Sequence, residues 1–225
     1  MATTNVNAKD KAREMRCLGA AIVEIVEATG VNRNVIRKWI KDIELTDAHK
    51  AALIERNPRW ANAYEGGQAN RRKGQIQRKA AQQTGRERAQ QADPLHRKGC
   101  ILYWAEGAKH ESSIHLINTD PDMLVFFMRF LRESLNVLDE WVSLYVHCNT
   151  EDVLEHERMK RYWLHVLHLP LSCFRKVLLK PKSKHLHTAQ DNGICTIQVR
   201  KTHLVMHIFG AIQEYTGIDN PAWLF

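Results

Sequence analysis

The sequence predicts an N-terminal all-α domain at residues 1–62, a basic helical linker at residues 63–92 and a C-terminal α+β domain at residues 93–225. Three observations support this division. The first part contains short apolar stripes at helical spacing, the linker contains almost no large apolar side chain, and the last part mixes strictly alternating segments with helical ones. The chain has 225 residues and is 44% hydrophobic, which is enough to bury a core in each folded part.

The excess positive charge lies in the first part of the chain. Residues 1–92 contain 18 lysines and arginines against 10 acidic residues, whereas residues 93–225 contain 15 of each. A basic part joined to a neutral part indicates a polyanion-binding module attached to a domain with another role. Nucleic acid fits better than a membrane surface, because no basic helix here carries a bulky apolar face.

Residues 11–43 contain three short helical segments with two interruptions. Leu18-Gly19 ends the first segment, and Thr29-Gly30 makes a tight turn between the second and the third. Apolar residues at helical spacing predict the buried side, and they are Ile22, Ile25, Val26, Val31, Val35, Ile36, Trp39 and Ile40. Polar groups occupy the other side of the third segment, at Asn32, Arg33, Asn34, Arg37, Lys38 and Lys41.

This polar face matches the major groove of DNA, where arginine pairs bidentately with guanine and asparagine with adenine. Residues 32–41 are therefore predicted to be a recognition helix, the alternative being an ordinary solvated basic face. The segment resembles the helix-turn-helix of resolvases and small bacterial regulators, at Gly19, Ile22, Glu24, Ile25, Gly30, Val31 and Trp39. Ala21 and Asn32 replace the usual hydroxyl residues, but Asn32 can still cap the third helix.

The linker is expected to contact the phosphate backbone. Between residues 66 and 91 a single acid, Glu87, stands against seven cations, Arg71, Arg72, Lys73, Arg78, Lys79, Arg86 and Arg88. Gly74 and Gly85 interrupt a composition that otherwise permits a helix, which predicts a frayed helix or flexible arm that DNA would order. The same composition also fits a solvated linker.

Alternating patterns predict the elements of the C-terminal domain. Helices are expected at about 94–106, 121–135, 153–169 and 202–215, and strands at about 112–118, 141–148, 174–180 and 194–200. A basic loop at 181–192 joins the last two strands. A second phosphate-contacting patch is possible at Arg175, Lys176, Lys180, Lys182, Lys184, His185 and His187.

Residues 99–107, GCILYWAEG, form an apolar helix that ends in Ala-acid-Gly. This element resembles the signature helix of LAGLIDADG proteins, which include homing endonucleases and intron maturases, and the resemblance extends over about residues 93–217. In that family two such helices pack together, and the acid at each helix end binds a divalent metal over the scissile phosphates. The resemblance implies a homodimer with an interface at Cys100, Ile101, Tyr103, Trp104 and Gly107.

Ala105, Glu106 and Gly107 match the end of the motif, so the resemblance places Glu106 as the catalytic acid and the ligand of Mg²⁺. The sequence departs from the family in the bulky pair Tyr103-Trp104 and in the short segment 108–118, which barely allows two strands. Two-metal cleavage needs several carboxylates, so Glu106 also fits a helix-end carboxylate that binds no metal.

Cysteine and histidine usage predicts no further site. The five cysteines lack a C-x-x-C pair, which predicts reduced and mostly buried thiols. Histidine pairs such as His203 and His207 lack cysteines at ligand spacing, so they are interpreted as core or surface residues. Residues 1–10 are polar and no run of about 18 apolar residues occurs, so neither a signal peptide nor a membrane span is expected.

Together these features predict a sequence-specific double-stranded DNA-binding protein, a dimeric transcriptional repressor or similar regulator of a prokaryote or a mobile element. It is expected in the cytoplasm at the nucleoid, without a cofactor and without a membrane partner. The alternative is a Mg²⁺-dependent, site-specific homing-type endonuclease that uses Glu106 of each protomer. A maturase-like, RNA-binding role is a third possibility.

Overall fold

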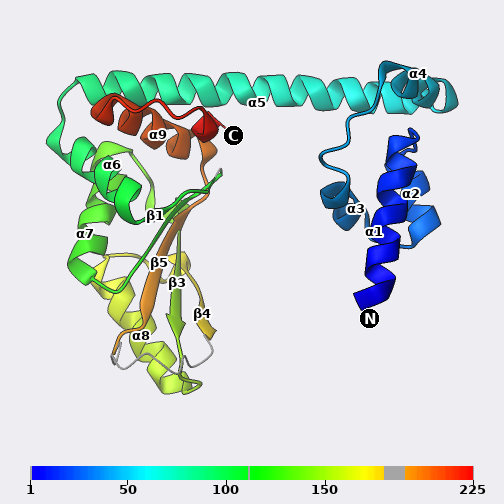
Figure 1. The fold of residues 1–225 in the computed structure, drawn as a ribbon. Helices are drawn as coiled ribbons and strands as arrows, with labels where there is room; N and C mark the ends of the chain where they lie inside the picture. Colours follow the sequence, from blue (N-terminus) through cyan, green and yellow to red (C-terminus); the bar gives the residue numbers. More distant parts are fainter. Residues whose placement is uncertain (1, 111, 180–190, 225) are drawn as a thin grey trace. The chain divides into compact units, whose positions relative to one another are not determined.

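The computed structural model describes residues 2–110, 112–179 and 191–224. The chain divides into two compact units, Met1–Lys73 and Gly74–Phe225. This division lies within the predicted linker, and the long helix α5 (Pro58–Gln90) contributes residues to both units (Figure 1). The described residues form helices and one mixed sheet, so the α+β class is confirmed in this general sense.

Short helices surround a small apolar core in the first unit. Helices α1 (Ala2–Cys17), α2 (Ile22–Thr29), α3 (Arg33–Trp39) and α4 (Asp47–Arg56) precede α5. Ala12 of α1, Ile25 of α2 and Ile36 of α3 are fully buried together, with Ile40 beside them. α1, α2 and α3 each contribute one apolar face to this core, and the burial of these faces holds the three helices together.

Local sequence signals set the turn between α2 and α3. Gly30 adopts a left-handed backbone with φ of 66°, which glycine tolerates best. Asn32 then caps α3, since its Oδ1 accepts a hydrogen bond of 2.9 Å from the backbone N–H of Asn34. At the start of α2 no hydroxyl is present, and Glu24 accepts a hydrogen bond of 2.6 Å from the backbone N–H of Ala21.

The second unit contains a five-stranded sheet with the strand order β1-β2-β5-β3-β4. The strands are β1 (Gly107–Ala108), β2 (Ile114–Asn118), β3 (Val142–Cys148), β4 (Phe174–Leu179) and β5 (Ile194–Val199). β3 and β4 are parallel and are connected through α8 (Val153–Val166), whereas the other pairs are antiparallel. β4 and β5 therefore do not pair with each other, because β5 lies between β2 and β3.

Helices and one face of this sheet share the core of the second unit. The helices are α6 (Pro94–Glu106), α7 (Pro121–Arg129), α8 and α9 (Thr202–Thr216) (Figure 1). Helix α7 continues into a π-helical turn at Phe130–Ser134. Short 3-10 turns lie at Asp139–Trp141, Leu171–Cys173 and Pro221–Leu224. Burial alternates along β3, where Val142, Leu144, Val146 and Cys148 face the core. This alternation is the pattern expected of a strand with one covered face.

The end of α5 is part of the packed second unit, which corrects the prediction of a frayed or flexible arm. A Cβ atom added to Gly85 would lie 2.0 Å from the carbonyl oxygen of His207, and one added to Gly210 would lie 2.0 Å from that of Gln82. The two glycines thus let α5 and α9 approach backbone to backbone. Gly85 was expected to interrupt the helix, but this close packing offsets its poor helix propensity.

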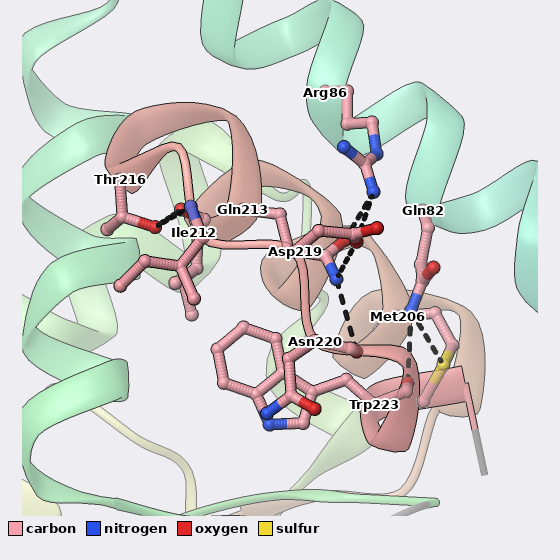
Figure 2. Close-up of polar contacts among 10 residues, drawn as sticks. Gln82, Arg86, Met206, Ile212, Gln213, Thr216, Asp219, Asn220 and Trp223 are labelled. Carbon is pink, nitrogen blue, oxygen red and sulfur yellow. Dashed lines mark hydrogen bonds and ion pairs between the residues drawn. The ribbon is translucent and has the colours of Figure 1, made fainter.

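Side-chain hydrogen bonds reinforce this crossing (Figure 2). Gln82 donates to the carbonyl oxygen of Trp223 at 3.0 Å, and Arg86 donates to Oε1 of Gln213 at 2.6 Å. Gln213 in turn donates to Asp219 at 3.1 Å, so the segment after α9 is joined to α5. A cavity of about 260 Å³ lies along this segment, and Arg86, Gln213 and Asp219 of its lining bond to one another.

Two sequence predictions concern the chain as a whole. The cysteines carry free thiols, with Cys17 exposed and the other four buried. Within the described ranges, no helix has both the length and the apolar character needed to cross a bilayer.

Part of the second basic patch, Lys180, Lys182, Lys184, His185 and His187, lies outside the described residues.

Candidate nucleic-acid interface

The predicted recognition helix presents its polar residues to solvent. Exposed side chains are those of Asn32, Arg33, Asn34, Arg37, Lys38 and Lys41. On the opposite side Ile36 is fully buried and Ile40 is 5% exposed, so two isoleucines fix the helix to the core of the first unit. The sequence thus distributes polar and apolar side chains along α3 as an amphipathic helix requires.

The cations on this face are not neutralised by the protein. Arg33, Arg37, Lys38 and Lys41 make no side-chain hydrogen bond or ion pair within the part of the chain that the structure describes. Surface cations without carboxylate partners keep their full charge for an external anion. Their arrangement along one short helix concentrates that charge on a surface narrow enough for a DNA groove.

Arg13 contacts the end of α3 and forms an ion pair with Asp42. Its guanidinium contacts Asp42 in a bidentate geometry, with N–O distances of 2.7 and 2.6 Å, and also donates to the carbonyl oxygen of Trp39. The hydrogen bond from Arg13 holds the pKa of the Asp42 carboxyl at about 2. Arg13 therefore links α1 to the residues that end α3, and it forms an ion pair with the carboxylate that follows this helix.

Asn32 caps α3 as predicted, because its amide oxygen accepts a hydrogen bond from the backbone N–H of Asn34. One residue of this segment differs from its predicted place. Val35 was predicted to belong to the buried stripe, but it is 37% exposed. The prediction was wrong because α3 turns Ile36 and Ile40 inward, and Val35 lies about 100° around the helix from Ile36.

The predicted backbone-contacting cations of α5 fall into two groups. Arg71, Arg72, Lys73 and Lys79 are exposed. Arg86 instead donates to Gln213, and Arg88 donates to Asp93 at 2.7 Å and to Gln91, while Arg78 is half-buried. The structure therefore assigns Arg86 and Arg88 to holding the second unit together.

Glu106 lies exposed at the end of α6, immediately before β1. Lys109 follows it and donates to the carbonyl oxygens of Trp104 and Gly107 at 2.6 and 2.7 Å, which satisfies the end of the helix. No group of three His, Cys, Asp or Glu side chains that could hold a metal occurs in the described ranges. Mg²⁺ is usually held by one or two carboxylates together with substrate phosphates and water, and Glu106 would supply one such carboxylate from each chain.

The helix α6 contributes more to the core than the resemblance implied. Cys100 and Tyr103 are fully buried, Gly107 is buried, and the Tyr103 hydroxyl donates to the carbonyl oxygen of Ala108 at 2.6 Å. These three residues pack inside their own protomer, which corrects their assignment to a dimer interface. Ile101, at 36% exposed, and the half-buried Trp104 remain accessible.

A histidine pair, with His96 buried and His207 half-buried, was missed by sequence reasoning. Nε2 of His96 on α6 lies 3.0 Å from Nε2 of His207 on α9, and Nδ1 of His96 lies 2.7 Å from the Tyr215 hydroxyl. Nδ1 of His207 lies 3.4 Å from the Thr84 hydroxyl of α5. Burial lowers the pKa of each ring to about 4, so both are neutral at pH 7. Nothing in the spacing of these four residues signals that they meet.

Comparisons of the chain with protein-family models, curated proteins and solved structures gave no match. The two resemblances, at residues 19–39 and 99–107, are therefore supported only by the residues that carry them. Evidence on function comes from the exposed face of α3 and from the charge of the first part of the chain.

Proposed function

We propose that the chain is a sequence-specific double-stranded DNA-binding protein whose helix α3 reads bases in the major groove. The observation that supports this most is the face of Arg33, Asn34, Arg37 and Lys38, exposed and without a side-chain partner among the described residues. The major groove is about 12 Å wide and admits one α-helix. Arginine and asparagine side chains from such a helix discriminate guanine and adenine by paired hydrogen bonds.

Other cations in the first part of the chain supply contacts to phosphate. Lys41 lies just past α3, and Arg71, Arg72 and Lys73 lie exposed on α5. Each lysine or arginine that neutralises a phosphate releases condensed counterions, so its contribution is independent of sequence and falls with salt. Base contacts thus determine which sequence is bound, and these cations raise the affinity for all sequences.

We place the protein among prokaryotic or mobile-element regulators that act as dimers, with the LAGLIDADG-like second unit as the dimerising part. Exposed apolar side chains on two contacting helices support this, namely Ile101 on α6 and Val125 on α7, which is 39% exposed. A single short recognition helix makes few base contacts. Two linked copies gain effective concentration on paired half-sites, so a repeated or palindromic operator is expected.

Random-site selection with the purified full-length chain tests this function. A duplex library at about 150 mM salt should yield one enriched motif, and the selected duplex should bind roughly 1,000-fold or more tightly than a scrambled duplex of the same composition. Selection without an enriched motif, or equal binding to both duplexes, would contradict sequence-specific recognition. A structured RNA competitor in the same assay tests the maturase-like role, because preference for RNA would replace the DNA assignment.

The endonuclease alternative is tested with the same selected duplex. The selected DNA is incubated with the protein and Mg²⁺, beside the Glu106→Gln variant. Cleavage by the wild type that disappears in the variant would make the protein an enzyme. Tight binding without cleavage would leave it a regulator.

A further inference from the structure

Val35 is an apolar side chain on the polar face of the recognition helix. Its helix neighbours Val31 and Trp39 are partly buried against the core of the first unit, whereas Val35 is 37% exposed. Among the side chains of this unit that the structure describes, the other large apolar ones that are exposed, Leu18, Val23 and Ile54, lie outside α3. Val35 thus exposes apolar surface beside the outward-facing polar groups of α3.

We infer that Val35 contacts the 5-methyl group of a thymine in the bound duplex. This inference rests on the proposed function and specifies one base that α3 reads. The thymine methyl projects into the major groove and is recognised there by apolar contact. A valine suits this contact because its branched Cβ leaves one strongly preferred rotamer in a helix, so little conformational freedom is lost on binding.

Two neighbours of Val35 predict which base lies next to the contacted thymine. Asn34 precedes it with an exposed side-chain amide, while Lys38 lies three residues on and therefore beside Val35 on the helix surface. Asparagine reads adenine in the groove, and lysine pairs with phosphate or with guanine. The selected site should therefore contain a thymine whose methyl group matters, close to an adenine that Asn34 reads.

Replacing single thymines by deoxyuridine tests the contact, because this removes only the methyl group. Each thymine of the selected duplex is substituted in turn, and affinity is measured by fluorescence anisotropy with the full-length wild type and with Val35→Ala. Burying one methyl group corresponds to about a fourfold change in affinity. One deoxyuridine position should weaken wild-type binding by about that factor, and the same position should have no effect on Val35→Ala.

Two control variants sharpen the result. Val23→Ala removes another exposed valine, from α2, and should retain the wild-type response to deoxyuridine. Val35→Thr keeps one methyl group in place and should retain part of the response. Because Val35 is far more exposed than the core residues Ile36 and Ile40, Val35→Ala should keep the fold, which its circular dichroism spectrum checks.

The outcomes separate this inference from the proposed function. Loss of binding in Arg37→Ala, without a deoxyuridine position that distinguishes wild type from Val35→Ala, would overturn the thymine contact and leave the DNA reader intact. A selection without an enriched motif would overturn both. Equal losses in wild type and Val35→Ala at the sensitive position would also overturn the contact, because another residue would then read the methyl.

Discussion

Gly85 of α5 and Gly210 of α9 meet at a helix crossing where neither position has room for a Cβ atom. Gly85→Ala should therefore destabilise the second unit, although alanine is the better helix former. Overpacking costs about 1–3 kcal/mol, which exceeds the gain in helix propensity of up to about 1 kcal/mol. Thermal unfolding followed by circular dichroism should show a lower Tm for Gly85→Ala.

Gly74 in the same helix provides the matched control. No atom lies within 4 Å of a Cβ added there, so Gly74→Ala should raise the stability by up to about 1 kcal/mol. If Gly85→Ala unfolded at the same temperature as Gly74→Ala, the backbone contact between α5 and α9 would not exist as described.

The pair formed by the buried His96 and the half-buried His207 should make stability depend on pH. Each ring has a folded pKa of about 4 against 6.5 for an ordinary histidine, so the unfolded chain binds more protons between these values. Stability is therefore fully present above about pH 6.5 and is lost as the pH falls toward 4. One such ring accounts for about 2 kcal/mol between pH 7.5 and 5.

Denaturant titrations at these two pH values measure the effect. His207→Gln removes one titrating ring and should lose less stability on acidification than the wild type does. His165→Gln removes an exposed histidine of α8 and should behave as the wild type. Identical pH dependence of wild type and His207→Gln would show that this ring titrates normally.

The pairing of Arg13 with Asp42 should support DNA binding without a base contact. Arg13→Asp places two carboxylates at the end of α3, so affinity for the selected duplex should fall severalfold. Exchanging the partners, as Arg13→Asp with Asp42→Arg, should restore a large part of the loss, because the ion pair reforms in reverse. A double variant that binds no better than Arg13→Asp would show that Arg13 itself, and not the pairing, is needed.

Neutralising the exposed cations of α5 should weaken binding to all DNA alike. Changing Arg71, Arg72 and Lys73 to glutamine leaves up to three phosphates without a cationic partner. The slope of log K against log salt should become shallower by roughly 0.9 for each phosphate that is no longer neutralised. Anisotropy titrations at four salt concentrations measure this slope on selected and scrambled duplexes. A fall in the ratio between the two duplexes would instead assign base contacts to these residues.

Local signals in the sequence predicted most of the secondary structure. Gly30 and Asn32 fix the turn before α3 through backbone conformation and a cap, which depend only on neighbouring residues. The alternating run in β3 likewise identified a strand and its buried face. Strand order could not be inferred in this way, since the insertion of β5 between β2 and β3 depends on contacts between residues distant in the sequence.

The candidate site was predicted in outline but not in its packing. Exposed cations on α3 followed from helical periodicity, whereas the outward position of Val35 depends on how a seven-residue helix meets the core. Arg13 and Asp42 are 29 residues apart, so no local pattern indicates that they pair. Gly85 and Arg86 looked like linker residues because their partner, α9, comes more than a hundred residues later.

The affinity of Arg37→Ala for the selected duplex tests the proposed reading of DNA most directly. Loss of one bidentate base contact corresponds to about 1–3 kcal/mol, so binding to the selected duplex should weaken roughly 5- to 150-fold while binding to the scrambled duplex changes little. Lys98→Ala removes an exposed cation from α6 and controls for the loss of charge. An unchanged ratio of selected to scrambled affinity in Arg37→Ala, equal to that of Lys98→Ala, would contradict the assignment of α3 to the major groove.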